Sequence, residues 1–435
     1  MKKQVVLLFS LMVALVSNAQ VTIGKDFSVK MYGQIRTDIY YNSRDNNQSV
    51  DGLFYMYPKD EVLDPNGKDL NASDNSNMYA VYSRLGFDFA GPKLGKAKTS
   101  AKIEFDFRGN GNDNLSIVRL RHAYFNLDWG KSKLLIGQTW HPFYGDVAPQ
   151  ILNLNMGAPF QPFGRAPQIR YRYQSGDVQW QIAALWQSQY KTYGPTAADG
   201  SGNSRVQQFH KNSNIPELTL GVDYKADGWI AGVGIDMLSI VPRTQSKWGD
   251  KTYKVDERLT TLSYEAHVKY TNEKLYFAAK STLGSNMTHV SMTGGYGIKS
   301  VDSKTGERKY TAFRNSSTWV NIAYGKKWRP ALFFGYMKNL GTADDLMGEP
   351  VIVEGGDCGT PEGYVYGKVY YGTGTKLDKL VSGTFELTSN VPHWKIGVEY
   401  NYTSAWYGYN KKDGKVENAH SVGNNRLVLS ALYTF

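Results

Sequence analysis

The amino-acid sequence predicts an all-β fold, a single transmembrane antiparallel up-and-down β-barrel of about 16 strands. Three observations lead to this prediction. The chain opens with an export leader, its remaining length divides into segments of alternating apolar and polar residues, and short connections alternate with long ones. We therefore expect short periplasmic turns and long extracellular loops.

Residues 1–19 have the composition of a secretory signal peptide. Lys2 and Lys3 precede the apolar run VVLLFSLMVALV, and the small residue Ala19 stands before a cut at Gln20. We expect residues 20–435 to form one barrel domain. Removing the leader lowers the Lys and Arg count from 50 to 48 against 39 acidic residues, a net charge of +9.

The composition restricts how such an exported chain can fold. The single Cys358 rules out a disulfide within the chain, so hydrogen bonding and packing must stabilise it. After the leader, no apolar run approaches the roughly 18 residues of a spanning helix. The mean hydropathy of −0.45 is typical of soluble proteins, but alternation within barrel strands averages to similar values. Aromatic residues make up 14% of the chain, which suits aromatic girdles at the membrane interfaces.

The alternation is clearest in the first predicted strand, residues 27–42. Val29 and Ile35 fall on one face, whereas Gln34 and Asp38 fall on the other, because a strand places successive side chains on opposite faces. The same pattern recurs in residues 78–91, 98–109, 178–190, 217–226, 260–270, 317–325, 331–339, 380–388, 394–404 and 425–435. The apolar face is expected to meet lipid and the polar face to line the lumen.

The connections between these segments alternate in length. The short ones are GPKLGK, WGKSK, QSGD, KADG, TNEK, GKKW and SNVPH; the long ones span residues 43–77, 191–214, 284–313 and 341–376. An up-and-down barrel requires this asymmetry, whereas a secreted β-sandwich does not. Several β domains in series are the other alternative, but no linker-like boundary separates the segments. Because unpaired backbone groups are costly in hydrocarbon, the sheet should close on itself.

The last segment, NRLVLSALYTF, ends on the aromatic residue Phe435. Chain ends usually fray, but an aromatic ring is favoured at a membrane interface. With both termini on one side of the membrane, this strand would pair with the first one. The segment resembles the assembly signal of outer-membrane barrels, which the barrel-insertion machinery reads.

Residues 141–168 are the best candidate for a constriction inside the barrel. A barrel of this size is too wide for side chains to fill, and it leaves a water-filled channel unless something plugs it. The segment carries several prolines and a group of bulky apolar residues: Ile151, Leu152, Leu154, Met156, Phe160 and Phe163. These would dock on the wall if the loop folds inward. The alternative is an outer loop that covers a neighbouring subunit.

Arginines gather around this segment and in nearby strands. The candidate constriction and anion-selecting residues are Arg36, Arg84, Arg119, Arg121, Arg165, Arg170 and Arg172, with Glu104, Asp106 and Asp146 expected to face them across the opening. Guanidinium groups offer fixed donors to carboxylate or phosphate and raise the local anion concentration. Alternatively, these arginines pair with wall carboxylates or lipid headgroups. Arg119 and Arg121 break the alternation of their strand, and a β-bulge could re-aim them inward.

Five stretches resemble trimeric outer-membrane porins, and most closely the DcaP-like porin family of Gram-negative bacteria. They are LRHAYFNLDWGKSKLLIGQTWHPF, GRAPQIRYRY, FFGYMKNLGT, WKIGVEYNYTSAWYG and LVLSALYTF. The resemblance implies a sixteen-stranded homotrimer in the bacterial outer membrane, with an inward third loop and passive uptake of small, often anionic, solutes. Some members carry an N-terminal coiled coil, whereas here the first strand begins soon after the cut.

Motifs of established catalytic chemistry do not occur in the sequence, which contains no HExxH, no GxSxG and no phosphate loop. We therefore expect no enzyme activity, no cofactor and no metal site. The cations are spread through the strands without a basic arm, so nucleic acid is not an expected partner. The expected partners are small hydrophilic solutes and ions, outer-membrane lipid and lipopolysaccharide, the barrel-assembly machinery, and further copies of the chain.

Two functions remain open from the sequence. The favoured one is a water-filled channel for passive diffusion of small hydrophilic, chiefly anionic, solutes. The alternative is a barrel with a closed lumen that acts in surface binding or adhesion through long loops such as residues 355–378. Ion conductance separates the two.

Overall fold

The computed structural model describes residues 21–23, 26–49, 51–109, 116–347 and 370–435. The expected leader and Cys358 lie outside these residues, as does much of the long connection 341–376. In the described part of the chain, no helix is both long and apolar enough to cross a membrane.

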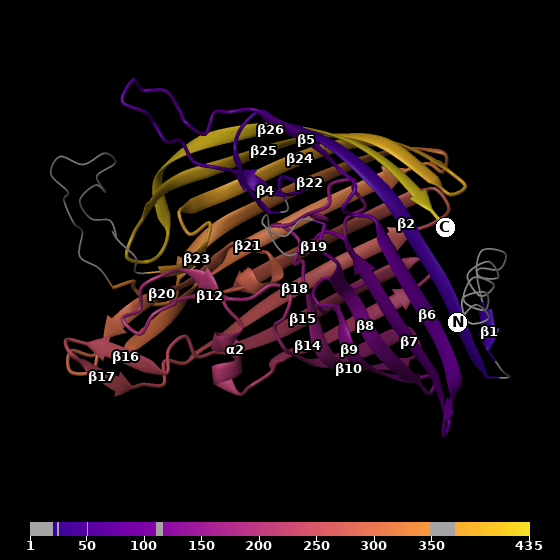
Figure 1. Ribbon diagram of the computed structural model, residues 1–435, viewed down its shortest axis with the longest axis horizontal. Helices are drawn as coiled ribbons and strands as arrows, with labels where there is room; N and C mark the ends of the chain where they lie inside the picture. Colours follow the sequence, from indigo (N-terminus) through magenta and orange to yellow (C-terminus); the bar gives the residue numbers. More distant parts are fainter. Residues whose placement is uncertain (1–20, 24–25, 50, 110–115, 348–369) are drawn as a thin grey trace, which may run out of the picture.

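Sixteen antiparallel strands of the described residues close into a barrel, as the sequence predicted, and short extra strands lie in the connections (Figure 1). The wall strands are β2 (Phe27–Asn42), β6 (Arg84–Leu94), β7 (Ala97–Asp106), β8 (Arg119–Asp128), β9 (Ser132–Trp140), β10 (Arg165–Ser175), β11 (Val178–Leu185), β14 (Glu217–Ala226), β15 (Trp229–Ile240), β18 (Leu259–Thr271), β19 (Leu275–Ser285), β21 (Arg308–Tyr324), β22 (Trp328–Thr342), β24 (Leu377–Val391), β25 (Trp394–Asn410) and β26 (Val416–Thr434). Because β2 pairs with both β6 and β26, the wall has no free edge.

The seam between β2 and β26 accounts for the aromatic chain end. The two strands pair in register from Gln34 opposite Thr434 onward. The amide of Gly33 donates to the carbonyl of Phe435 at 3.0 Å, and the amide of Phe435 donates back to Gly33 at 3.1 Å. Both ends of the barrel wall lie at the same end of the molecule in Figure 1. The predicted pairing of the first and last strands is confirmed.

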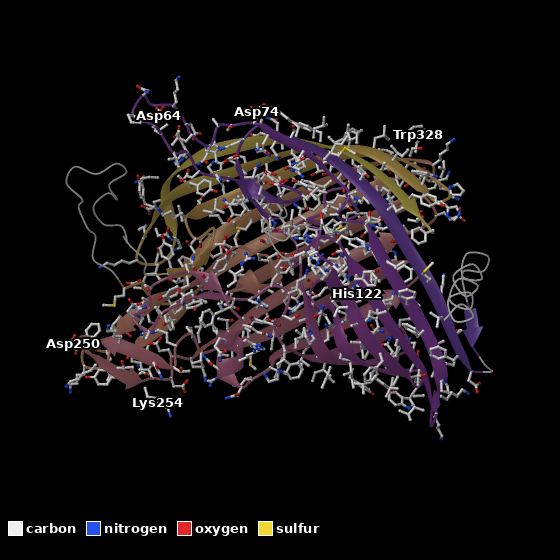
Figure 2. All side chains as sticks on the ribbon, viewed as in Figure 1. Asp64, Asp74, His122, Asp250, Lys254 and Trp328 are labelled. Carbon is white, nitrogen blue, oxygen red and sulfur yellow. The ribbon has the colours of Figure 1, made fainter. Side chains whose placement is uncertain are left out.

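The two ends of the barrel differ in the length of their connections. All seven predicted short turns join consecutive wall strands at the end where β2 begins and β26 ends. The remaining described elements are β1 (Val21–Ile23), which pairs with the start of β2, and those in the connections: β3 (Asn46–Ser49), β4 (Phe54–Pro58), β5 (Asn75–Tyr79), β12 (Tyr193–Gly194), β13 (Ser204–Arg205), α2 (Gln208–Ser213), β16 (Gln245–Trp248), β17 (Lys251–Lys254), η1 (Thr288–Val290), β20 (Gly294–Val301) and β23 (Tyr370–Thr373). In Figure 2, Asp250 and Lys254 mark the loop end and Trp328 marks the turn end.

One predicted connection, residues 284–313, is too long. The wall strand β21 begins at Arg308, and its first residues pair with β20. The sequence of this stretch is rich in charged and polar residues, which is typical of a loop, but pairing with β20 makes its last residues part of a strand.

Wall residues alternate between the lumen and the exterior. On β2, Ile35 and Ile39 are 56% and 44% exposed, whereas Asp38 is 2% exposed. Trp180 on β11 and Leu220 on β14 continue the exposed apolar surface. An apolar exterior of this extent belongs in hydrocarbon. Since the outward rows are exposed rather than covered by a second sheet, the β-sandwich alternative is wrong.

Loop L3, residues 141–164 between β9 and β10, lies inside the barrel. The amide of Leu152 donates to Glu386 Oε2 at 2.6 Å, and the amide of Asn153 donates to Glu399 Oε2 at 2.9 Å. These carboxylates belong to β24 and β25, on a part of the wall far from β9 in strand order. The apolar residues of L3 join the buried clusters of the interior: Val147, Ile151, Leu154, Phe160 and Phe163. The alternative of an outer loop over a neighbouring subunit does not fit these contacts.

Candidate functional site in the barrel lumen

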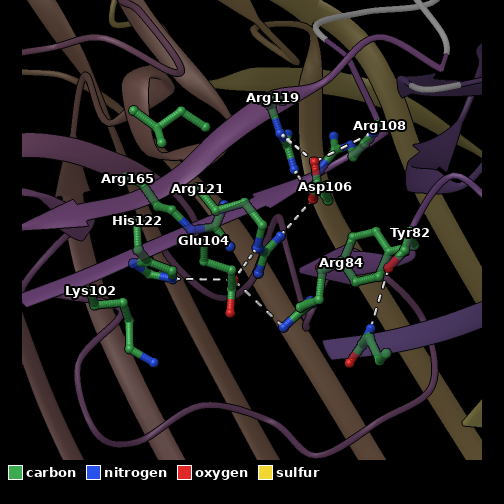
Figure 3. Close-up of polar contacts among 12 residues, drawn as sticks. Tyr82, Arg84, Lys102, Glu104, Asp106, Arg108, Arg119, Arg121, His122 and Arg165 are labelled. Carbon is green, nitrogen blue, oxygen red and sulfur yellow. Dashed lines mark hydrogen bonds and ion pairs between the residues drawn. The ribbon is translucent and has the colours of Figure 1, made fainter. Parts of the chain in front are cut away.

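Six of the ten predicted residues meet on one part of the wall. We call this group, together with one further arginine, the arginine cluster (Figure 3). It consists of Arg84 on β6, Glu104 and Asp106 on β7, Arg108 just after β7, Arg119 and Arg121 on β8, and Arg165 at the start of β10. Three consecutive antiparallel strands supply five of these residues, and L3 returns to the wall at Arg165. Their convergence therefore follows from strand order.

A β-bulge turns both arginines of β8 toward the lumen. Glu104 pairs with His122, but the next residue of β7, Phe105, pairs with Leu120, so Arg121 is the extra residue. Arg121 is 2% exposed, whereas Leu120 is 45% exposed on the outer surface. A bulge of the kind that would re-aim these arginines is present at this point.

The carboxylates of the cluster lie beside the arginines. Arg119 Nη2 is 2.7 Å from Asp106 Oδ2, and Arg121 Nη1 is 2.8 Å from the same oxygen. Arg121 Nε is 2.5 Å from Glu104 Oε1, and Arg84 Nη1 is 3.9 Å from it. The expectation that Glu104 and Asp106 face the arginines across the opening is wrong, because β7 and β8 are hydrogen-bonded neighbours.

The cluster carries more positive than negative charge. Its five guanidinium groups face two carboxylates, and several N–H groups remain without an acceptor within the described residues. These buried donors are Arg84 Nε, Arg108 Nη1, Arg165 Nε and Arg165 Nη2. The guanidinium carbon of Arg165 lies 3.5 Å from the centroid of the Trp140 ring, a cation–π contact that holds the group in place. The cluster therefore has an excess of positive charge, which favours an anion nearby.

Tyr82, in the short segment between β5 and β6, responds to this charge. Burial raises the pKa of its phenol, but the guanidinium groups of Arg121, Arg84 and Arg165 outweigh burial and lower the pKa to about 7. The field at this point is therefore strong enough to stabilise a buried anion near neutral pH.

A cavity of about 400 Å³ opens beside the cluster. Its lining combines charged and aromatic side chains: Tyr82, Arg84, Lys102, Glu104, Arg121, His122, Tyr124, Thr139, Trp140, Tyr144 and Met156. The rings of Trp140 and Tyr144 stack at 3.8 Å between centroids, and Nδ1 of His122 lies 2.9 Å from Thr139 Oγ1. Cationic donors next to flat apolar surface suit a small organic anion.

Arg36 lies at the edge of the cluster. Its guanidinium carbon is 5.6 Å from the centroid of the Tyr82 ring, and its Nη2 is 2.8 Å from Asp38 Oδ1. The same nitrogen donates to the Leu152 carbonyl of L3 at 2.5 Å. Arg36 thus links β2, the cluster and the tip of the loop.

The last three predicted residues form a separate group near the root of L3. Arg172 lies 3.9 Å from Asp146, which pairs with Lys225 at 2.7 Å. Burial alone would raise the pKa of Asp146, but the positive charges of Arg172 and Lys225 outweigh burial and lower the pKa to about 2. Arg170 is buried and donates to Gln168 Oε1 at 2.8 Å. Asp146 is therefore a paired anion and does not oppose the arginine cluster.

Sequence reasoning missed four residues of this site: Arg108, Tyr82, Trp140 and Tyr144. Arg108 has the same parity in the sequence as Glu104 and Asp106, so the alternation of the strand already indicated that its side chain faces the lumen. The three aromatic residues sit at a strand end or in connections, where alternation stops and no local signal marks a lumen position.

Comparison with known proteins agrees with this architecture. Residues 8–205 match the sequence model of the DcaP outer membrane protein family. The outer membrane channel DcaP of Acinetobacter baumannii superposes with a TM-score of 0.66 at 19% identity, covering 96% of this chain and 100% of that one. OmpT of Vibrio cholerae gives 0.53 at 12% identity, covering 95% and 100%. An anion-selective porin from Comamonas acidovorans gives 0.50 at 10% identity, covering 94% and 100%.

No curated protein sequence matches the chain significantly. The family match in the first half and the shared barrel over nearly the whole length confirm the resemblance drawn from the sequence. They also confirm the expected location. Over residues 8–205 the chain matches the DcaP outer membrane protein family, and its fold is that of a β-barrel of the bacterial outer membrane.

Proposed function

We propose that this protein is a porin that lets small hydrophilic solutes diffuse passively through its lumen, with a preference for anions. The family match and the barrel support the porin function. The single observation that carries the anion preference is the arginine cluster, in which five guanidinium groups stand beside two carboxylates and four buried donor atoms have no acceptor within the described residues. Fixed cations in a confined passage raise the local concentration of anions.

The surroundings of the cluster strengthen the anion preference. The lowered pKa of Tyr82, to about 7, is what a positive potential produces at a buried acidic group. Interactions between exposed charges are screened within about 8 Å at physiological salt. A solute that passes the cavity of about 400 Å³ comes into direct contact with Arg84 and Arg121, so screening does not remove the preference.

Other features belong to the same proposal. Residues 1–19 are a leader that export removes, and residues 20–435 insert into the outer membrane with the help of the assembly machinery. The protein acts as a homotrimer; OmpT of Vibrio cholerae, which has the same fold, has been solved in a trimer form. The exposed apolar wall meets lipid, and the long loops meet lipopolysaccharide. Two solved structures with this fold, DcaP of Acinetobacter baumannii and the porin of Comamonas acidovorans, are a channel and a porin, which favours transport over catalysis.

Single-channel recording in planar bilayers tests the proposal. Wild-type protein should give discrete conductance steps, and its reversal potential in a salt gradient should show anion preference. Arg84→Gln combined with Arg165→Gln should shift that potential toward the cation side. Arg314→Gln is the matched control, because Arg314 is an exposed arginine of β21 outside the cluster.

The possible outcomes bear on different parts of the proposal. Without conductance steps the channel is wrong, and the closed-lumen alternative, which acts through surface binding, takes its place. If conductance is present but the Arg84 and Arg165 variant matches wild type in reversal potential, the channel stands and the role of the arginine cluster is wrong.

A further inference from the structure

A second buried group of polar residues lies where the root of loop L3 meets the wall. His141 is the first residue of L3, Glu217 begins β14, Asp236 lies on β15, and His289 belongs to η1 in the connection after β19. We call these four residues the histidine–carboxylate site. Each is at most 5% exposed. Four separate parts of the chain thus converge on one water-excluded point.

The imidazole nitrogens of the site point at its carboxylates. His141 Nε2 lies 2.8 Å from Glu217 Oε1 and 3.7 Å from Asp236 Oδ1. His289 Nε2 lies 2.7 Å from the same Glu217 oxygen. The donor atoms of His141, Glu217 and His289 all lie within 4.8 Å of one another. This is the spacing of groups that share one small cation.

The two carboxylates have no permanent positive charge to balance them. In the part of the chain that the structure describes, the ion-pair partners of Glu217 and Asp236 are histidines, which are neutral unless protonated. Glu217 Oε2 and both carboxylate oxygens of Asp236 are buried without a hydrogen-bond partner. Buried charges are normally paired or coordinate a metal, and one divalent cation balances both carboxylates.

We propose that the histidine–carboxylate site binds one divalent transition-metal ion of the Zn²⁺ type. Imidazole nitrogen combined with carboxylate oxygen is a donor set that zinc uses. Glu217 and His289, whose contacting atoms lie 2.7 Å apart, are direct ligands. Asp236, whose Oδ1 lies 3.7 Å from His141 Nε2 and has no hydrogen-bond partner, is the third candidate ligand. Zinc ligands at about 2.0–2.2 Å from the metal stand roughly 3.4 Å apart in a tetrahedron. Widening the contact between His289 and Glu217 by less than about 1 Å therefore admits the ion.

His141 holds a ligand rather than the ion. Its Nδ1 accepts the amide proton of Phe143 at 3.1 Å, so the imidazole keeps its own proton on Nε2 and donates it to Glu217. Carboxylates that bind metals are commonly oriented by such hydrogen bonds. Apolar side chains that form a buried cluster beside His141 and η1 keep water away: Phe143, Met287, Val290 and Met292.

The sequence analysis expected no metal site, and the proposal departs from it. The four residues are spread from position 141 to position 289 with no metal motif, so only the closed barrel brings them together. A bound ion would join the root of L3 to β14, β15 and the connection after β19. It would therefore rigidify the root of L3.

Metal titration of the detergent-purified protein tests the site. The mature chain is produced without a histidine tag, stripped with a chelator, and titrated with Zn²⁺ in competition with a chromogenic zinc indicator. One tightly bound ion per chain is expected. Glu217→Gln and Asp236→Asn should each remove this tight binding. His141→Ala should weaken it about 10- to 100-fold, as loss of an orienting partner does.

His420→Gln is the control, because His420 is an exposed histidine paired with Asp60 at 2.7 Å. It should bind Zn²⁺ like wild type. The characteristic change in gel mobility on heating shows whether each variant has folded, and His289→Gln replaces any variant that has not. The proposal is overturned if wild type binds no ion in this titration, or if folded Glu217 and Asp236 variants bind as wild type does.

Discussion

The packing of the Phe160 ring against Gly335 gives the most direct test of what holds loop L3 in place. A Cβ atom on Gly335 of β22 would lie 2.6 Å from Cγ of Phe160. Phe160 is 3% exposed, and its ring centroid is 6.3 Å from that of Phe333. Gly335→Ala therefore fits only if the Phe160 ring leaves its seat or the loop shifts. We expect the variant barrel to form and L3 to be held less tightly.

The size of the effect follows from the packing. Full burial of a phenylalanine side chain stabilises a fold by about 1.5–3 kcal/mol. If the ring stays beside the added methyl group, the overpacking costs about 1–3 kcal/mol. A loss of 1–3 kcal/mol raises the population of the unseated loop about 5- to 150-fold. The amides of Leu152 and Asn153 are bonded to wall carboxylates, so their hydrogen exchange requires the loop to open. Exchange of these amides should accelerate by the same factor.

Gly383→Ala supplies the matched control. Gly383 lies on the neighbouring strand β24, where an added Cβ would meet nothing within 4 Å. Both variants change glycine to alanine in a wall strand, so their effects on strand propensity are alike. Exchange is measured by mass spectrometry on peptides from residues 150–163. If Gly335→Ala exchanges no faster than Gly383→Ala, packing at this seat does not hold the loop and the reasoning is refuted.

Three further predictions concern the pH response, the barrel seam and the chain end. Because the pKa of Tyr82 is about 7, its phenolate offsets positive charge above that pH. The anion preference of the wild type should therefore fall between about pH 6 and pH 8. The Tyr82→Phe variant should keep its low-pH reversal potential over the whole range. Arg426→Met removes two hydrogen bonds of 2.9 Å, which the guanidinium donates to Asn42 Oδ1 and to the Gly52 carbonyl. The change should lower the unfolding free energy by about 2–4 kcal/mol. An unchanged urea midpoint would contradict this. Deleting Phe435 removes two backbone hydrogen bonds to β2 and should slow folding into liposomes, and equal folding rates would show that the chain end is dispensable.

The wall of this barrel could be predicted from the sequence because lipid imposes one rule on every strand. Residues such as Ile35 and Trp180 face hydrocarbon, and their neighbours face the lumen, so a period of two runs through the whole wall. The same rule located Arg84, Glu104 and Asp106 on the lumen side. Where alternation broke, at Arg119 and Arg121, the break itself pointed to the bulge that the structure contains.

The rest of the site could not be predicted, because contacts between distant segments determine it. Nothing near Glu386 or Glu399 in the sequence indicates that their carboxylates accept the amides of Leu152 and Asn153, more than 230 residues earlier. The expectation that carboxylates oppose the arginines failed for a related reason. Register between neighbouring strands, which one strand alone does not reveal, places Asp106 beside Arg119.

Loop L3 covers two carboxylates of the lumen wall, Glu386 and Glu399, and so keeps them away from a solute. Glu386 and Glu399 are 0% and 1% exposed beneath the amides of L3, and Asp146 of the loop pairs with a lysine at 2.7 Å. Arg84 Nε and the Nε and Nη2 of Arg165 are buried without an acceptor within the described residues. A solute in the cavity therefore meets Arg84 and Arg121, while Glu386 Oε2 and Glu399 Oε2 accept the amides of L3. Under the proposed function, loosening L3 exposes those acceptors, so Gly335→Ala should reduce anion preference together with loop protection. Faster exchange with an unchanged reversal potential would show that the arginine cluster alone sets the selectivity.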